Sequence, residues 1–174
     1  MNIHAIYKYT ETELKALLAS MVVLVDTREQ EASHITNYFE KQKIALKSAK
    51  QDTGDYAAMI PKNDVLGIHR DTYFPFIVER KNSIDELASS IKEERFEHEL
   101  IRSQKSHFTL LIEGSYYDLV HGNYRSQYNA KALLARIKTF EARYGFSTTF
   151  MDKQLSGNWI YWHLYYHVRT ALKG

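Results

Sequence analysis

The sequence predicts an α/β protein with a central mixed β-sheet flanked by α-helices. Short apolar runs, which are typical of buried strands, alternate along the chain with longer segments of helical periodicity. The run Met21–Val25 is the first of these strands. The clearest helix is Ala130–Tyr144, where Leu133, Ile137 and Phe140 share one face. Strands and helices that alternate in this way favour a sheet covered by helices.

The first predicted element is a helix over residues 10–19. Thr10 is placed to cap this helix, and Glu13 stands at the capping-box position three residues later. The other elements expected before residue 61 are a helix at 31–42, an extended segment at 44–49, and a strand at 56–60 that follows the turn Gly54-Asp55.

Residues 61–75 form the least regular part of the sequence. They contain Asn63-Asp64, Gly67 and two prolines, which favour turns over regular structure. Two interpretations are open. The stretch is the return of a hairpin through residues 65–69, or it is a loop over the functional site.

From residue 76 onward the alternation of strands and helices continues. Ser83 is placed to cap a helix whose apolar residues recur at i, i+3, i+4 and i+7 from Ile84. The remaining strands are expected at 76–81, 107–113 and 146–151, and the remaining helices at 93–104, 116–122, 130–144 and 158–172.

The composition is that of a folded protein, with 44% hydrophobic and 25% charged residues. We expect one domain, 1–174, with a core at about 20–150 and an aromatic C-terminal helix at about 158–172. The sequence has no apolar run of about 18 residues and no leader, so no membrane span or secretion signal is expected. The expected location is cytoplasmic, or nucleoid-associated, or nuclear for a eukaryotic source. The absence of cysteine excludes disulfides, thiolate ligands and a cysteine nucleophile.

The net charge of +2 conceals an uneven distribution. Acidic residues exceed basic ones over residues 1–100, whereas basic residues exceed acidic ones over 101–174. An acidic half that holds cations beside a basic half that holds a polyanion would suit nucleic-acid chemistry. The alternative is an unevenly charged, solvated surface without a specific ligand.

An abrupt change from apolar to charged residues marks the segment Phe76–Asp85. If it begins with a strand, alternation places Glu79 and Lys81 on one face and Arg80 on the other. A carboxylate beside an ammonium group is typical of a metal-dependent phosphodiesterase site. On this segment alone, an edge strand with a solvated pair of charges explains the pattern equally well.

Two other strand ends also carry charge. Asp26 and Glu29 follow the first predicted strand, and Asp55 precedes the strand at 56–60. Phosphodiester hydrolysis uses divalent cations, and Mg²⁺ and Mn²⁺ prefer carboxylate and carbonyl oxygens. A site that collects these acids beside Lys81 would supply cation ligands together with a positive charge for the transition state.

The same residues form a recognisable pattern. It resembles the XPF/Mus/Hef (ERCC-type) family of structure-specific endonucleases, whose hallmark is a GDY turn followed by V-E-R-K-x-x-x-D. The residues that carry the resemblance are Asp26-Thr27-Arg28-Glu29, Gly54-Asp55-Tyr56, Val78-Glu79-Arg80-Lys81 and Asp85. The resemblance covers roughly residues 20–150 and implies the PD-(D/E)XK, restriction-endonuclease-like fold. It also implies DNA cleavage that depends on Mg²⁺ or Mn²⁺ and leaves a 5′-phosphate and a 3′-hydroxyl.

Carried over position by position, the resemblance implies a role for each charged residue. Lys81 would be the catalytic lysine. Asp26 and Glu29 would complete the acidic cluster, and Arg80 would pair with a carboxylate or grip a phosphate. The implied metal ligands are the side chains of Asp55, Glu79 and Asp26 and the backbone carbonyl of Arg80.

Downstream positions also resemble the family. Those that would close over the site are Ser90, Ile91, Arg95 and Phe96, and Arg95 is also a candidate DNA contact. Glu99 falls near a position where family members often carry glutamine. Asp85 lies in the first turn of a predicted helix, which indicates a helix N-terminal acid more than a metal ligand.

Two features depart from the family pattern. The connection between Asp55 and Glu79 is longer than usual, so residues 61–75 resemble an insertion that could alter substrate entry. No helix-hairpin-helix module, which helps family members to bind branched DNA, follows in the sequence. Branched, flap or fork DNA is the substrate that the resemblance implies, but the sequence does not select among these structures.

The helix predicted at 130–144 carries candidates for DNA-backbone contacts. These are Lys131, Arg136, Lys138 and Arg143. The alternative is that the four side chains form an ordinary solvated face of the helix.

Aromatic residues crowd the closing helix, at Trp159, Tyr161, Trp162, Tyr165 and Tyr166. They cover nearly every face of a helix, so we expect some in the core and the rest on a partner surface or stacked on bases. Family nucleases commonly dimerise through this domain. The resemblance therefore implies a homodimer, or a protein partner for targeting.

None of the eight histidines falls in a metal-binding frame such as H-E-x-x-H. We therefore expect His98, His107 and His121 to be surface or polar-network residues.

The sequence thus predicts a metal-dependent DNA endonuclease. The alternative is a non-catalytic DNA-binding or scaffolding module that keeps the nuclease fold, although the intact Asp55, Glu79 and Lys81 argue against a decayed site. An RNA-directed nuclease would use the same residues, and the sequence does not separate it from the first hypothesis.

Overall fold

The computed structural model describes residues 8–174. Its centre is a six-stranded sheet with the order β2-β1-β3-β4-β5-β6. β3 is antiparallel to both of its neighbours and the other adjacent strands are parallel, so the sheet is mixed, as predicted. The strands are β1 Val22–Val25, β2 Ala45–Ser48, β3 Tyr56–Ile60, β4 Thr72–Lys81, β5 His107–Glu113 and β6 Ser147–Met151.

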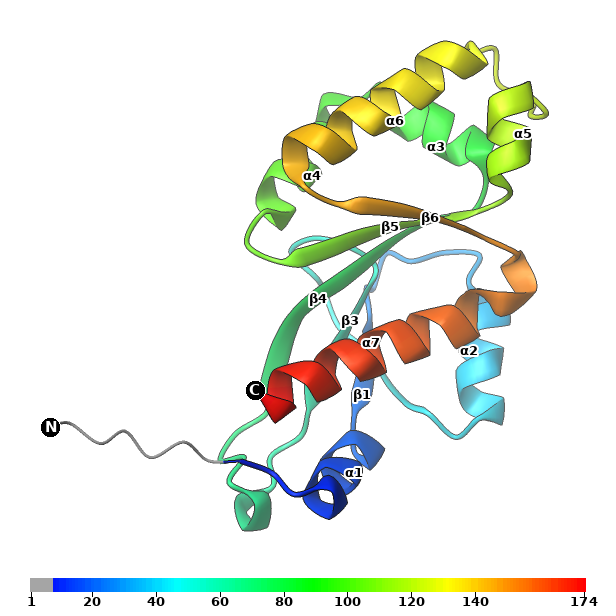
Figure 1. Ribbon diagram of the computed structural model, residues 1–174. Coiled ribbons are helices and arrows are strands. Elements are labelled where there is room, and N and C mark those ends of the chain that lie inside the picture. The colour runs from blue at the N-terminus through cyan, green and yellow to red at the C-terminus, as the bar shows by residue number, and fades with distance from the viewer. Residues whose placement is uncertain (1–7) are drawn as a thin grey trace, which may run out of the picture.

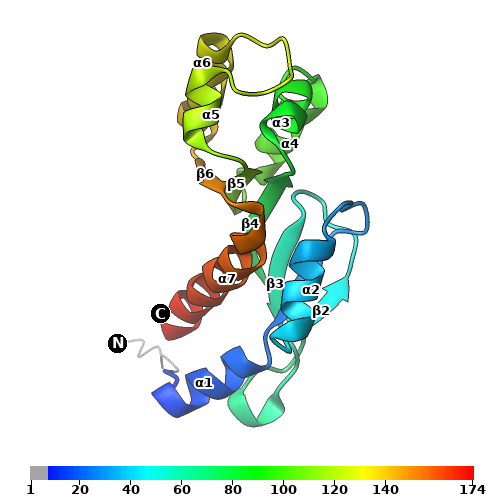
Figure 2. The same cartoon turned by 90° about the vertical axis from the view of Figure 1, so that its right-hand side faces the viewer.

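Helices cover both faces of this sheet (Figures 1 and 2). One face carries α1 Glu11–Ala19, α2 Ser33–Lys41 and α7 Ser156–Lys173, and the other carries α3 Ile84–Ser90, α4 Glu94–Ser103, α5 Tyr116–His121 and α6 Ala130–Tyr144. Two short 3₁₀ turns, η1 Asp64–Leu66 and η2 Lys153–Leu155, complete the fold. The predicted α/β fold class is confirmed. Within residues 8–174, none of the helices combines the length and the hydrophobicity that crossing a membrane requires.

Local signals in the sequence fix two of the helix starts. The Thr10 hydroxyl accepts a hydrogen bond from the Glu13 backbone N–H at 3.2 Å, and the Glu13 carboxylate accepts one from the Thr10 N–H at 2.8 Å. This is the predicted capping box. Ser83 caps α3 by accepting a hydrogen bond from the Glu86 N–H at 3.0 Å. Both predicted caps are therefore confirmed.

β4 divides its side chains between the two faces of the sheet. Val78 joins the core beneath α1, α2 and α7, whereas Ile77 packs against the core beneath α3, α4 and α6. The alternation continues to the end of the strand, where Glu79 and Lys81 pair with each other on the side of Ile77. Arg80 points to the opposite side, toward the start of α2. This is the division of the charges that the sequence predicts.

Residues 61–75 connect β3 to β4 at the end of β3 that lies opposite Asp55. Thr72 pairs with Ile60 in the antiparallel ladder, so the hairpin interpretation is correct and the loop over the site is wrong. The stretch does not border the charged strand ends. Pro75 lies in β4 where the register between β3 and β4 shifts, and a proline is tolerated there because the ladder is already interrupted.

Gly54 is required by its backbone and by its surroundings. Its φ is +76°, and an added Cβ would lie 2.0 Å from Cγ2 of Ile77. This methyl group is attached directly to the Ile77 Cβ, so moving it away requires a change of the stiff Ile77 χ1 rotamer or a shift of β4. Gly145 has a similar φ of +67°, but an added Cβ there would meet no atom within 4 Å.

We therefore predict that Gly54→Ala destabilises the fold more than Gly145→Ala. The first substitution adds a steric clash to the strain of a positive φ and should cost roughly 2–4 kcal/mol. The second adds strain only and should cost about 1–2 kcal/mol. Urea unfolding of the two variants measures the difference. Equal losses of stability would contradict the proposed clash with Ile77.

Candidate active site

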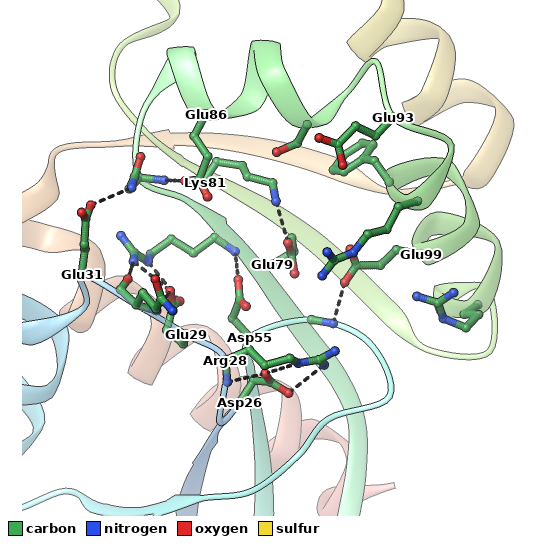
Figure 3. A pocket seen from close by; sticks show the side chains of 18 of the residues that line it. Asp26, Arg28, Glu29, Glu31, Asp55, Glu79, Lys81, Glu86, Glu93 and Glu99 are labelled. Atoms are coloured by element: carbon green, nitrogen blue, oxygen red, sulfur yellow. Dashed lines mark hydrogen bonds and ion pairs between the residues drawn. The ribbon is translucent and has the colours of Figure 1, made fainter.

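The charged strand ends open into one cleft of about 530 Å³ (Figure 3). It lies between the turns after β1 and before β3 on one side and the helices α3 and α4 on the other. All six predicted catalytic residues line it: Asp26, Glu29, Asp55, Glu79, Arg80 and Lys81. The predicted DNA contact Arg95 lines it as well.

Strand direction explains why these residues meet. β1 ends at Asp26, and β3 starts after Asp55 at the same edge because the two strands are antiparallel. The Asp26 N–H donates to the Asp55 carbonyl at 2.8 Å, and the Asp55 N–H donates to the Val78 carbonyl at 2.9 Å. The backbone ladder thus holds three separate segments of the chain in register at the site.

Glu79 and Lys81 form a buried ion pair in the cleft. The Lys81 Nζ lies 2.9 Å from the Glu79 Oε1, and the two residues are only 6% and 8% exposed. Burial raises the pKa of Glu79 to about 7, although the Lys81 ammonium opposes this rise; the nearby carboxylate of Glu99 adds to it. The Lys81 Nζ also lies 5.5 Å from the centre of the Phe96 ring, which covers it from α4.

Asp55 is the second carboxylate of this group. Its Oδ2 accepts a hydrogen bond from the Arg80 backbone N–H at 2.8 Å. Burial raises the pKa of Asp55 well above its usual value, and the negative charges of Glu79 and Glu29 raise it further. Holding the carboxylates of Asp55 and Glu79 together therefore costs electrostatic free energy, which a bound cation would offset.

The donor set of the cleft fits a hard divalent cation. Asp55 and Glu79 offer carboxylate oxygens whose mutual repulsion a cation relieves. In an extended strand, the N–H and the C=O of a residue point to the same side. Since the Arg80 N–H points to Asp55, the Arg80 carbonyl is directed to the same edge of the strand, beyond the start of β3. Three oxygen donors of this kind suit Mg²⁺ or Mn²⁺.

Asp26 is engaged within the protein. Its carboxylate accepts hydrogen bonds from the Arg28 side chain at 2.8 and 3.0 Å and from the backbone N–H groups of Arg28 and Gln51 at 2.8 and 2.7 Å. Burial opposes ionisation of this carboxyl, but these hydrogen bonds outweigh burial and lower its pKa to about 2. Asp26 therefore shapes the turn after β1, and its predicted role as a metal ligand stays a prediction.

Arg80 and Glu29 belong to a buried ion network on the other face of β4. The guanidinium donates to both Glu29 carboxylate oxygens, at 2.9 and 3.1 Å, and also to Glu113 at the end of β5. Burial disfavours the charged guanidinium, but the bonds to Glu29 and Glu113 outweigh this effect and raise the pKa of Arg80. The Arg80 side chain therefore pairs with carboxylates, which is one of the two roles that the resemblance implies.

The cleft is also lined by charged residues that the motif alone did not assign to the site. Glu99 on α4 accepts a hydrogen bond from the Gly54 N–H at 3.1 Å, so it anchors the turn before Asp55. The sequence feature that pointed to Glu99 was its position near the residue that is often glutamine in the family. The others are Arg28, Glu31, Glu86 and Glu93, which Figure 3 labels, together with Asp52 and Arg102.

The downstream family positions divide between the cleft and the core. Ser90, Arg95 and Phe96 line the cleft, whereas Ile91 is buried in the core beneath α6. Asp85 accepts a hydrogen bond from the Ser126 N–H at 2.7 Å and does not line the cleft. It thus acts as the helix N-terminal acid that the sequence indicates.

The four basic candidates on α6 lie outside the residues that line the cleft. Arg136 donates to the Ile91 carbonyl at 3.1 Å, and Arg143 donates to Glu97 at 3.0 Å. Lys138 pairs with Glu141 at 2.8 Å on the exposed surface, and Lys131 is exposed. Contact with DNA at these residues stays a prediction.

The aromatic side chains of α7 are not the ones that this helix buries most deeply in the core. The buried hydrophobic side chains of this helix are aliphatic, namely Ile160, Leu164 and Val168. Trp162 and Tyr166 are 42% and 57% exposed. The other three aromatic residues are half-buried. The predicted homodimer or protein partner stays a prediction.

Comparison with known proteins agrees with this fold. The ERCC4 domain model matches residues 25–162. The chain is also similar to XPF from Aeropyrum pernix (TM-score 0.62, 21% identity, 85% of this chain and 65% of that chain covered). It is likewise similar to XPF from Aeropyrum pernix in complex with DNA (TM-score 0.60, 21% identity, 86% of this chain and 66% of that chain). No curated protein matches the sequence significantly.

The mixed sheet, the helical layers and the likeness to the XPF structures define an α/β protein with a nuclease fold. Because the ERCC4 domain model covers most of the sequence, the chain belongs to the ERCC4 domain family. It spans less than two thirds of the length of the XPF chains that it resembles, so the similarity concerns this domain.

We predict that Glu99→Gln lowers the pKa of Glu79. The amide keeps an oxygen that accepts the Gly54 hydrogen bond, but it removes a negative charge that helps to raise the pKa of Glu79. Glu79 should therefore ionise at a lower pH in the variant. An NMR titration of the side-chain carboxyl carbons, in the presence of EDTA, measures this shift.

Glu94→Gln is the matched control, because Glu94 lies on the same helix, is exposed and does not line the cleft. It should leave the pKa of Glu79 unchanged. An unchanged pKa in Glu99→Gln would show that the two carboxylates do not interact.

Proposed function

We propose that this protein is a metal-dependent endonuclease that hydrolyses phosphodiester bonds in DNA. The observation that carries the proposal is the convergence of Asp55, Glu79 and Lys81 in one cleft of a nuclease fold. Two buried carboxylates with raised pKa values provide a cation site, and a buried lysine lies beside them. A purely structural role would not require such a costly arrangement of charges.

The side chains of Asp55 and Glu79 and the carbonyl of Arg80 would hold Mg²⁺ or Mn²⁺. Such a cation would polarise the scissile phosphate and acidify the attacking water. Lys81 would place its ammonium group beside the reacting phosphate, where it stabilises the developing negative charge. Glu79 orients this ammonium group through the 2.9 Å ion pair. The products would carry a 5′-phosphate and a 3′-hydroxyl.

DNA is the proposed substrate, and branched, flap or fork DNA is the proposed class. Support comes from the XPF structure that was solved in complex with DNA and shares this fold. The exposed Arg28 and the cleft residues Arg95 and Arg102 provide positive charge at the rim of the acidic centre. A phosphate that enters the cleft would therefore meet cationic side chains before it reaches the metal ligands.

We predict that the protein cleaves labelled DNA with Mg²⁺ or Mn²⁺ and not with EDTA. Glu79→Ala and Lys81→Ala should each lower the cleavage rate at least about 100-fold, because each removes a group that acts on the metal or on the phosphate. Fork, flap, duplex and single-stranded DNA and a matched RNA would be compared under the same conditions. Glu94→Ala, which alters an exposed residue outside the cleft, is the control.

Two results would overturn this proposal. Metal-independent binding without cleavage of any substrate would support the alternative of a non-catalytic DNA-binding or scaffolding module. Undiminished cleavage by Glu79→Ala or Lys81→Ala would show that the reaction takes place elsewhere. Cleavage of the RNA in preference to every DNA would replace the proposed substrate class.

We further predict that the α6 lysines contribute to the salt dependence of DNA binding. Each phosphate contact that is removed should reduce the slope of log K against log salt by about 0.9 on duplex DNA. Lys131→Gln combined with Lys138→Gln should therefore lower the slope by nearly 2. Arg136 and Arg143 are left intact because they bind Ile91 and Glu97 outside α6, whereas Lys138 pairs with Glu141 on the same helix.

The matched control is Lys15→Gln combined with Lys41→Gln, which removes the same charge from exposed positions on α1 and α2. Fluorescence anisotropy over a range of salt concentrations measures both slopes. If the two double variants change the slope equally, the α6 lysines act only through net charge and do not contact the backbone.

A further inference from the structure

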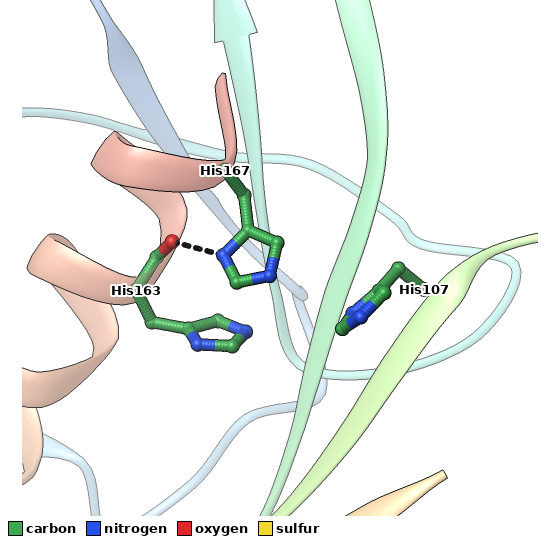
Figure 4. Close-up of side chains that lie close together, drawn as sticks. All are labelled: His107, His163 and His167. Carbon is green, nitrogen blue, oxygen red and sulfur yellow. Dashed lines mark hydrogen bonds between the residues drawn. The ribbon is translucent and has the colours of Figure 1, made fainter. Parts of the chain in front are cut away.

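Three histidines meet at the opposite end of β5 from the acidic cleft (Figure 4). His107 is the first residue of β5, and His163 and His167 lie on α7. One ring nitrogen of each histidine lies within 4.8 Å of one ring nitrogen of each of the other two. The spacing of His163 and His167 is visible in the sequence, but no local pattern joins His107 to them, because His107 lies more than 50 residues away along the chain.

The two elements bring these rings together for simple geometric reasons. His163 and His167 are four residues apart on one helix, so they share a face. His107 and Thr109 share a face of β5 because they are two residues apart. The Thr109 hydroxyl lies 3.4 Å from the His163 Nε2, which shows that α7 lies against this face of β5.

Hydrogen bonding selects the tautomer of His167. Its Nδ1 lies 2.7 Å from the backbone carbonyl of His163. A carbonyl only accepts hydrogen bonds, so Nδ1 carries the proton and Nε2 of the neutral ring has a free lone pair. Metal-binding histidines commonly donate their second N–H to a backbone carbonyl in this way.

His163 is kept neutral by its surroundings. Burial lowers the pKa of His163 to about 4, and the neighbouring rings of His167 and His107 lower it further. The ring stacks on Trp159 with 4.5 Å between the ring centres. Its Nε2 lies 3.4 Å from the Thr109 hydroxyl, where α7 meets β5.

The three rings have no carboxylate to balance a positive charge. Among residues 8–174, none of the three histidines forms an ion pair with an aspartate or a glutamate. Protonation of more than one ring would place like charges side by side. A bound cation that accepts the three lone pairs would instead satisfy all three rings at once.

We propose that His107, His163 and His167 form a binding site for Zn²⁺ that is separate from the acidic cleft. Three imidazole ligands with Zn–N distances of about 2.0–2.1 Å would lie roughly 3.3 Å apart, so the rings must close by about 1.5 Å at most. His107 is exposed, and its ring already lies 4.8 Å from the ring of His167 between the ring centres. Three protein ligands leave a fourth position on the metal for water.

The two sites differ in place and in chemistry. β5 runs from His107 to Glu113, which separates its two ends by about 20 Å at ~3.3 Å per residue. The cleft offers hard oxygen donors that suit Mg²⁺ or Mn²⁺, whereas the cluster offers nitrogen donors that suit Zn²⁺. Zinc bound at the cluster would join α7 to the start of β5 and so stabilise the packing of the C-terminal helix on the sheet.

Zinc binding to the untagged protein tests this proposal. The background is Asp55→Asn with Glu79→Gln, which removes the carboxylates of the cleft. We expect one Zn²⁺ per chain by mass spectrometry of the metal after dialysis. At free zinc of about 100 times Kd, Tm should rise by about 5–10 °C. Co²⁺ should give visible absorption bands that Zn²⁺ displaces.

His107→Gln is the principal variant, because the side chain is exposed and its loss should not disturb the fold. We expect it, like His167→Gln, to weaken zinc binding at least about 10-fold and to abolish the rise in Tm. His121→Gln is the matched control. His121 also bonds the carbonyl four residues before it, at 2.9 Å, but lies outside the cluster.

Three outcomes would overturn the proposal. They are no zinc retained in the background variant, equal zinc binding in His107→Gln and the background, and an equal loss of binding in His121→Gln. Zinc that is bound by the parent protein and lost in the background variant would assign the metal to the acidic cleft. Because cleavage is not measured, failure of the proposed nuclease function would leave this test unaffected.

Discussion

The buried guanidinium of Arg80 is the constraint on which the organisation of the site depends. It lies between Glu29, after β1, and Glu113, at the end of β5, and these three side chains are at most 8% exposed. The backbone N–H of Arg80 donates a hydrogen bond to the carboxylate of Asp55, which precedes β3. One residue of β4 thus ties three other segments together. Removing one partner of such a network typically costs about 3–5 kcal/mol, because a buried charge is left uncompensated.

This constraint separates structural charges from chemical ones. The Arg80 guanidinium forms an ion pair with Glu29 on one face of β4, and the Arg28 guanidinium forms one with Asp26 in the turn after β1. Glu79, Lys81 and Asp55 are left to face the cleft beside Glu99. Burial raises the pKa values of Asp55 and Glu79, and the Lys81 ammonium only partly offsets this rise. A site that is costly without a ligand and favourable with a cation is what metal-dependent chemistry requires.

β5 connects this acidic centre to the histidine cluster. Its side chains that face α2 and α7 include His107 and Thr109 near its start and Glu113 at its end. Glu113 supports the ion network, and His107 lies against α7. Both polar groups lie on the face of the sheet opposite the side chains of Glu79 and Lys81. The proposed zinc site, which is not part of the cleft, therefore depends on the packing of α7 on this face.

Local patterns in the sequence predicted the elements and most of the residues of the candidate site. Periodicity and capping residues identified α1, α3 and α6, and alternation along β4 correctly separated Glu79 and Lys81 from Arg80, because these signals depend on neighbouring residues only. The motif identified the six predicted catalytic residues, all of which line the cleft. Tertiary structure alone decided which carboxylate each arginine binds, that residues 61–75 lie away from the cleft, and that Glu99 reaches the turn at Gly54. It also brought His107 to α7. These contacts join residues that are far apart in the chain, and no local pattern specifies them.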